Sequence, residues 1–154
     1  MKVAFFDTSA LAKRYVDETG SEWVLSLFRE RESCLSHIAE LTTVEFTSAI
    51  VRRSKGGSLS ADAAAQILST FDLHLLSDYY VLEITSNLLS DACSLVKIYG
   101  LRGYDAVQLA VARDLNLTQT GRGLPVIPFV SSDSELLAAA KADGLLTDNP
   151  NDHS

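Results

Sequence analysis

Four acidic residues occupy positions along the chain that suggest metal-dependent chemistry. Asp7 directly follows an apolar run at residues 2–6, and Asp133 comes soon after another at residues 126–130. Both runs are typical of buried strands. Because ligands of open parallel α/β sheets bind beyond the carboxyl ends of the strands, we expect these two aspartates at one site. Asp105 opens an apolar helical segment, and Glu45 lies inside another.

Each aspartate also has a purely structural explanation. Asp7 and Asp133 could cap the helices that follow them, and Asp105 could complement the dipole at a helix N-terminus. The two residues after Asp7 could cap equally well, however. Ser132 and Glu135 match the S-x-x-E capping box, so the sequence predicts that capping does not require Asp133.

Glu45 is harder to explain as a structural residue. The positions three and four residues away hold no Lys or Arg, so no helical ion pair can form. Unpaired carboxylates beside a core are costly, and several brought together repel one another unless a cation neutralises them. A shared Mg²⁺ or Mn²⁺, hard ions that prefer oxygen ligands, would relieve that repulsion.

Strands and helices are predicted to alternate along the chain. This order implies an α/β three-layer sandwich, with a mainly parallel central sheet flanked by helices. The segment at residues 105–115 is apolar nearly all round, so we expect it to be enclosed. The strands are expected at 2–6, 33–36, 79–84, 126–130 and 145–147, and the helices at 10–15, 21–32, 38–55, from 60, 88–99, 105–115 and 131–144.

Length and composition indicate one globular domain. The chain has 154 residues, 47% of them hydrophobic, and we expect a single domain over 1–148 with a short tail at 149–154. The net charge of −7 lacks the basic footprint of a non-enzymatic nucleic-acid binder. No apolar run approaches the ~18 residues of a membrane span, so a cytoplasmic protein is expected, with both cysteines reduced.

Four segments together resemble the PIN-domain family, in particular the VapC-like toxins of prokaryotic toxin-antitoxin pairs. They are FFDTSALAKRY, VEFTSAIVRR, LRGYDAVQLAVA and FVSSDSELLAAAKADGLLTDNP, in that order. The resemblance covers nearly the whole chain. It implies a PIN-like fold and a metal-dependent endoribonuclease whose acidic cluster holds Mg²⁺ or Mn²⁺.

By this resemblance, Asp7 and Asp105 are the foremost direct metal ligands. Ser9 and Ser131 are expected to support the cluster from outside the metal's coordination shell. Glu40 competes for the helical position, although the family's run of small residues after the acid favours Glu45. The full acidic cluster is Asp7, Glu45, Asp105 and Asp133.

Basic residues supply candidate phosphate contacts. The best group is Arg52, Arg53 and Lys55. Tyr104 could stack on a base or pack in the core, and His37 is expected to be structural. Further candidate cations are Lys13, Arg14, Arg102, Arg113 and Arg122.

The predicted function is hydrolysis of RNA phosphodiester bonds by the toxin of a VapBC-type pair. The resemblance further implies a homodimer and a VapB-like antitoxin, whose arginine would pair with the carboxylates. Helices around Trp23 and residues 67–71 are candidate dimer surfaces. Two alternatives stay open: a PIN-fold nuclease without an antitoxin, directed at RNA processing or at DNA, and a catalytically inactive PIN-like RNA- or protein-binding module. A haloacid-dehalogenase-type phosphatase would need D-x-D, whereas Ser9 stands there, and a phospho-receiver's adjacent acid pair is absent.

Overall fold

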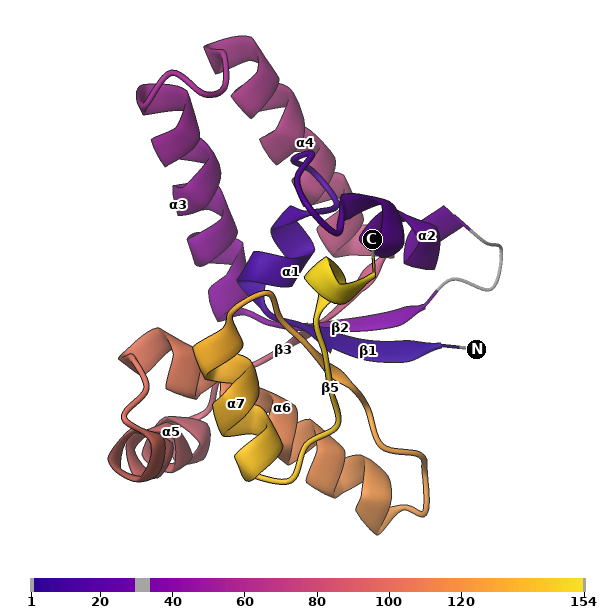
Figure 1. Cartoon of the computed structure of the whole chain (residues 1–154), viewed down its shortest axis with the longest axis vertical. Helices are drawn as coiled ribbons and strands as arrows, with labels where there is room; N and C mark the ends of the chain where they lie inside the picture. Colours follow the sequence, from indigo (N-terminus) through magenta and orange to yellow (C-terminus); the bar gives the residue numbers. More distant parts are fainter. Residues whose placement is uncertain (1, 30–33, 154) are drawn as a thin grey trace.

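One parallel sheet organises the chain. The structure is a computed structural model that describes residues 2–29 and 34–153. Its strands lie in the order β3-β2-β1-β4-β5, and every neighbouring pair is parallel (Figure 1). The predicted mainly parallel sheet is confirmed. The strands are β1 (Val3–Phe6), β2 (Leu35–Ala39), β3 (Tyr79–Leu82), β4 (Phe129–Val130) and β5 (Thr147–Asp148).

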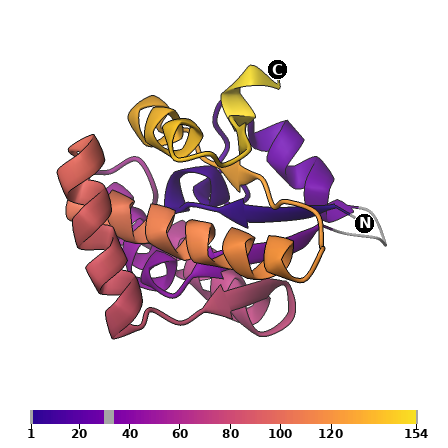
Figure 2. The same ribbon diagram turned by 90° about the horizontal axis from the view of Figure 1, so that it is seen from below.

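Helices cover both faces of the sheet and form two separate cores. The apolar side chains of α5, α6 and α7 pack on one face, and α6 runs along the sheet in Figure 2. Those of α1 to α4 pack on the other, where α3 and α4 project as an arm (Figure 1). The helices are α1 (Thr8–Ala12), α2 (Ser21–Arg29), α3 (Leu41–Lys55), α4 (Ala61–Ser77), α5 (Ser86–Tyr99), α6 (Gly103–Gly121), α7 (Ser134–Ala142) and the 3₁₀ helix η1 (Pro150–Asp152).

Successive residues of β1 and β4 face opposite sides of the sheet and so contribute side chains to both cores. Phe5 faces the α5–α7 side and stacks on Phe129 of β4, with 5.7 Å between ring centroids. Phe6, the next residue, faces the opposite core together with its sheet neighbour Val130. Burial of large side chains on both faces fixes the register, because a slip by one residue would exchange the faces.

Several predicted boundaries are wrong by a few residues. Residues 38 and 39 end β2 instead of beginning a helix, so α3 starts at Leu41. The predicted strand at 126–130 contributes only Phe129 and Val130 to the sheet, because Pro128 has no N–H to donate to a ladder. α6 extends beyond the predicted 105–115 on both sides. The enclosure predicted for this segment holds for residues 108–112, which are buried, but not for Arg113 and Asp114, which are exposed. Parts of two predicted elements, at residues 30–33, lie outside the described residues.

The end of the chain packs back onto α2. The His153 ring stacks on Trp23 with 4.2 Å between centroids, and its Nε2 lies 2.6 Å from Asp148 Oδ1. A Cβ at Gly20 would stand 2.6 Å from the Pro150 carbonyl oxygen, so only glycine fits this approach. Trp23 is therefore half-buried, and Phe71, in the other candidate dimer helix, is 1% exposed. In the described part of the chain, no helix has the length and apolar character needed to cross a bilayer.

Candidate active site

The strand order reverses beside β1, and the acidic residues gather at this point. The chain builds β1, β2 and β3 outward on one side, then returns to place β4 against the other side of β1. Such a switch at the carboxyl ends of parallel strands leaves a crevice for ligands. Asp7 follows β1 there, and its N–H donates to the Val130 carbonyl at the end of β4 (3.0 Å).

The Asp7 carboxylate is held on both oxygens. Its Oδ1 accepts hydrogen bonds from the Ser9 hydroxyl (2.8 Å) and the Ala10 N–H (3.0 Å), which makes Asp7 the cap of α1. Its Oδ2 accepts a hydrogen bond from the Ser131 hydroxyl (2.8 Å). Asp7 is only 4% exposed, so these three donors replace its hydration. Both serines that the family resemblance indicated thus contact Asp7.

Asp133 is the cap of α7, contrary to the expectation that Ser132 would be. The Asp133 Oδ1 accepts hydrogen bonds from the N–H groups of Glu135 (2.9 Å) and Leu136 (3.1 Å). The Ser132 hydroxyl, by contrast, is buried without a hydrogen-bond partner among the described residues. A carboxylate is the better cap here because its charge also complements the helix dipole. Its second oxygen stays available.

Glu45 and Asp105 complete a small acidic cavity. Glu45 projects from the middle of α3, and Asp105 from the first turn of α6. The cavity has a volume of about 140 Å³ and is lined by Asp7, Thr8, Ser9, Glu45, Tyr104, Asp105, Gln108 and Asp133. All four predicted acids therefore line one cavity, while Glu40 instead accepts a hydrogen bond from the Ile84 N–H (2.9 Å).

Burial and mutual repulsion disfavour ionisation in this cavity. Burial raises the pKa of Asp7 to about 6, against the opposing effect of its hydrogen bonds. The pKa of Asp105 is also raised to about 6, first by burial and then by the charges of Asp133 and Glu45. Within residues 2–29 and 34–153, none of the four acids forms an ion pair with Lys or Arg. The charge of Arg102 opposes the rise at Asp105 only in part, since the pKa still rises to about 6.

The donor set of the cavity suits a hard divalent cation. In the part of the chain that the structure describes, no three acidic, His or Cys side chains converge tightly enough to form a ready-made metal site. Mg²⁺ does not require one, because it keeps several waters and binds through one or two carboxylates. Four carboxylates that line one cavity, two of them with raised pKa values, fit such an ion.

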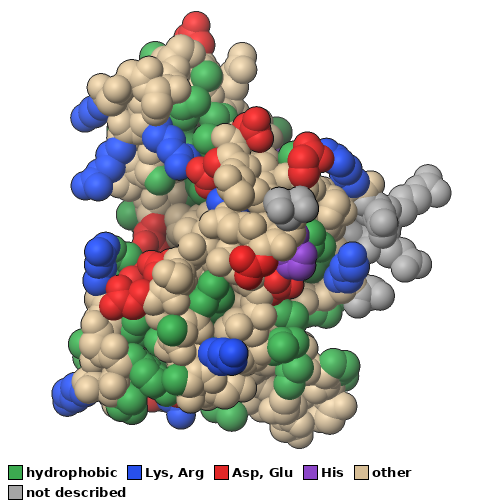
Figure 3. All heavy atoms as spheres, in the orientation of Figure 1, with side chains coloured by type: hydrophobic (Ala, Val, Ile, Leu, Met, Phe, Trp, Pro, Cys, Tyr) green, Lys and Arg blue, Asp and Glu red, His purple; other side chains and the backbone are tan. Residues whose placement is uncertain are grey.

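A larger groove opens from the acidic cavity. Its volume is about 660 Å³, and it shares Thr8, Ser9, Glu45 and Tyr104 with the cavity. Small and apolar residues of α1 and α3 line it, and Arg52 and Arg53 lie along it. In Figure 3, acidic atoms gather beneath the α3–α4 arm, with basic atoms above and beside them. Acidic and basic groups thus occupy neighbouring parts of this face.

The sequence match to a family model decides what kind of domain this is. The PIN domain model matches residues 4–142. The chain belongs to the PIN domain family. The resemblance inferred from the four segments is thereby confirmed. No curated protein matches the sequence of this PIN domain.

The likeness to solved structures with the same fold extends over almost the whole PIN domain. PAE2754 from Pyrobaculum aerophilum is 24% identical, with a TM-score of 0.62 over 96% of this chain and 89% of its own. A toxin-antitoxin complex from Klebsiella pneumoniae is 18% identical, with a TM-score of 0.58 over 96% and 97%. VapC20 from Mycobacterium tuberculosis, a sarcin-ricin loop cleaving toxin, is 17% identical, with a TM-score of 0.64 over 94% and 97%.

Several Lys and Arg residues that were candidate phosphate contacts are paired with other groups of this PIN domain. The Lys13 ammonium is 5% exposed and donates to Glu18 (3.2 Å) and to the Thr19 carbonyl (2.7 Å). The Arg14 guanidinium is also buried, paired with Asp78. The expectation that these two could contact phosphate is therefore wrong. Arg113 pairs with Asp143 (3.4 Å), and Lys55 is not among the residues that line the groove.

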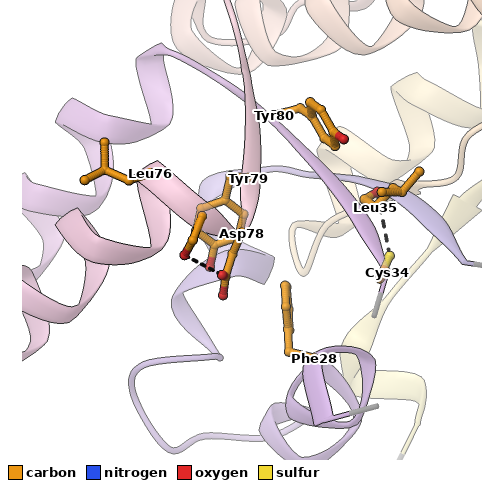
Figure 4. A pocket seen from close by; sticks show the side chains of 8 residues that line it. Phe28, Cys34, Leu35, Leu76, Asp78, Tyr79 and Tyr80 are labelled. Carbon is orange, nitrogen blue, oxygen red and sulfur yellow. Dashed lines mark hydrogen bonds between the residues drawn. The ribbon is translucent and has the colours of Figure 1, made fainter. Parts of the chain in front are cut away.

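A second hollow lies at the opposite end of the strands. Its volume is about 390 Å³, and its lining residues come from the starts of β2 and β3 and the end of α4 (Figure 4). Its one acid, Asp78, is already bonded to Ser77 (2.7 Å) and Arg14. Because the hollow lies at the amino ends of the strands, it does not share the crevice at the strand switch.

Three polar residues of the site were not predicted. Gln108 and Thr8 donate hydrogen bonds to the Glu45 carboxylate, and Thr42 contacts both of these residues. Gln108 lies in an otherwise apolar helical segment. A buried glutamine in such a segment must find hydrogen-bond partners, so its position could have indicated a role in a polar site. Nothing in the sequence indicated that its partner would be Glu45.

We predict that Asp7→Asn stabilises the metal-free protein at neutral pH. Because the folded-state pKa of Asp7 (about 6) exceeds its usual value of 3.8, ionisation of Asp7 costs stability as pH rises through this interval. In EDTA at pH 7.5, the variant should melt about 2–4 °C above wild type, for a gain on the order of 1 kcal/mol. The gain should shrink towards pH 4.5.

Thermal melts across this pH range, with Asp91→Asn as the matched control, test the prediction. Asp91 is exposed on α5. An Asp7→Asn protein less stable than wild type at pH 7.5, or a gain that does not change with pH, would contradict the assignment.

Proposed function

We propose that this PIN domain is a divalent-metal-dependent endoribonuclease and the toxin of a VapBC-type toxin-antitoxin pair. The observation that carries the proposal is the set of four carboxylates in one cavity at the strand switch, none of which has a Lys or Arg ion-pair partner in the described part of the chain. Structural likeness to proteins named as toxins supports this choice, and VapC20 is named as a sarcin-ricin loop cleaving toxin.

The cavity residues have distinct roles in this proposal. A bound Mg²⁺ or Mn²⁺ would polarise the scissile phosphate and lower the pKa of an attacking water. Asp105 has no hydrogen bond on either oxygen within the described residues, so it is the most available ligand, and Asp7 is the acid oriented most firmly by neighbours. Glu45 and Asp133 each present one further oxygen, because their other oxygen is already bonded.

The groove provides a path for the RNA strand. Tyr104 lies at the junction of cavity and groove, is 44% exposed, and its hydroxyl accepts a hydrogen bond from Arg102 (2.7 Å). An exposed ring at this point suits stacking on an unpaired base. Arg52 would contact a phosphate in the groove, with Lys55 one turn further at the end of α3. Arg53 pairs with Glu18 (3.5 Å) in the same groove and would exchange this partner for a phosphate.

The same groove would also serve an antitoxin. An arginine of a VapB-like segment entering the cavity would form an ion pair with these carboxylates, and it would exclude RNA at the same time. We further propose that the protein acts in the cytoplasm as a homodimer.

Cleavage of a total RNA pool should require both the metal and the aspartates. With Mg²⁺ or Mn²⁺ the purified protein should cut specific RNAs, and EDTA should abolish the reaction. Asp7→Asn and Asp105→Asn should each lower the rate by at least the ~10–100-fold typical of losing an outer-shell partner. Asp91→Asn removes an exposed acid and should stay active.

Two results would count against the nuclease. Cleavage that survives both substitutions would show that the cavity is not the active site. RNA binding without any cleavage, by folded protein with metal present, would favour the inactive binding module.

Arg52 should contribute a phosphate contact that a distant lysine does not. Fluorescence anisotropy of single-stranded RNA bound to Asp7→Asn protein measures affinity without cleavage. Adding Arg52→Ala should weaken binding and reduce the salt dependence of log K by ~0.7, the value for one contact on a single strand. Lys97→Ala, which removes an exposed charge from α5, is the matched control. Equal effects of the two substitutions would exclude Arg52 from the RNA path.

A further inference from the structure

Two side chains that are not acids donate hydrogen bonds to one oxygen of Glu45, and a third, Thr42, contacts both of them. The Gln108 Nε2 donates to Glu45 Oε1 at 2.8 Å, and the Thr8 hydroxyl donates to the same oxygen at 3.0 Å. The second Nε2 proton reaches the Thr42 hydroxyl oxygen at 2.9 Å. We call Thr8, Thr42 and Gln108 the Glu45 clamp. Glu45 Oε2 has no hydrogen-bond donor within the described residues.

The Glu45 clamp links the three helices that surround the cavity. Thr8 comes directly after Asp7 at the start of α1, and Thr42 lies one turn before Glu45 on α3. Gln108 lies one turn after Asp105 on α6. The Thr8 and Thr42 hydroxyl oxygens are 3.2 Å apart. These bonds therefore fix the spacing of the elements that carry three of the four acids.

The orientation of the Gln108 amide follows from its partners. With the amide reversed, the oxygen of Gln108 would face the Glu45 carboxylate, and two acceptors would repel each other. The nitrogen must therefore face Glu45, which leaves Gln108 Oε1 pointing elsewhere. This oxygen is buried without a partner in the described residues, in a side chain that is 2% exposed and lines the acidic cavity.

A buried unpaired carbonyl oxygen is unfavourable, typically by about 1–3 kcal/mol. A leucine of similar size would satisfy the apolar helix face better. A role of the amide in the site would explain why a glutamine stands here. The amide could orient Glu45 alone, or it could also hold a water at Oε1.

We propose that Gln108 is a positioning residue for Glu45. With Thr8 and Thr42 it immobilises one carboxylate oxygen, so that Glu45 presents only the other oxygen to a cation in the cavity. This inference rests on the proposed metal-dependent function. It assigns to Gln108 no contact with substrate.

Mn²⁺ binding provides a test that does not depend on cleavage. Electron paramagnetic resonance titration of free Mn²⁺ gives the dissociation constant for each folded variant. Gln108→Leu should weaken Mn²⁺ binding about 10–100-fold, the usual cost of removing an outer-shell partner. Gln119→Leu makes the same change near the far end of α6 and should not alter it. Melting temperature and circular dichroism confirm that the variants fold.

Rescue and coupling separate positioning from packing. Thr42 is fully buried, so Thr42→Val keeps its shape but loses the hydroxyl, whereas Thr42→Ser keeps the hydroxyl. Binding should fall in the valine variant and be restored in the serine variant. In a Glu45→Ala background, Gln108→Leu should change Mn²⁺ affinity less than about threefold, because its effect passes through Glu45.

The outcomes distinguish the two proposals. Wild-type protein that binds Mn²⁺, with Gln108→Leu and Thr42→Val unchanged, would overturn the Glu45 clamp alone. An equal loss from Gln108→Leu with and without Glu45 would also overturn it. Wild-type protein that binds no Mn²⁺ would overturn the metal-dependent function, and the clamp with it.

Discussion

Four carboxylates line a cavity of about 140 Å³, and their burial, together with their mutual repulsion, is the constraint that the surrounding structure must withstand. The sheet brings Asp7 and Asp133 together, because β1 and β4 are parallel neighbours whose carboxyl ends meet. α3 and α6 add Glu45 and Asp105 from opposite faces of the sheet. Two stacked phenylalanines in the neighbouring central strands, together with burial on both faces, keep this arrangement rigid.

The architecture could be predicted because its signals are local and repeated. Apolar strand runs alternate with amphipathic segments. Ser60 caps the start of α4, and the left-handed Gly100 ends α5, as the sequence indicates. The boundaries were less predictable. Residues 38 and 39 suit a buried strand and a helix equally well, and pairing with β1 and β3 decides for the strand. Local propensity does not contain that pairing.

The candidate site was predictable only in part. Its acids could be found because uncompensated charge beside apolar segments is unusual, but their caps and partners depend on contacts between distant segments. Thr8 and Gln108 are 100 residues apart. Burial of Lys13 depends on the turn that brings Glu18 and the Thr19 carbonyl to it. Sequence spacing does not predict such contacts. An exposed Lys or Arg therefore cannot be told from a buried one in the sequence.

The most direct test of the account is a carboxyl-carbon NMR titration of Asp7 and Asp105, with and without Mg²⁺. Without the metal, both should titrate near pH 6, because burial raises both pKa values and like charges add to the effect. Saturating Mg²⁺ should lower both midpoints by at least about one pH unit, since an opposite charge favours the carboxylates. Midpoints near pH 4 without metal, or midpoints that Mg²⁺ leaves unchanged, would contradict a shared cation as the solution to the cavity's repulsion.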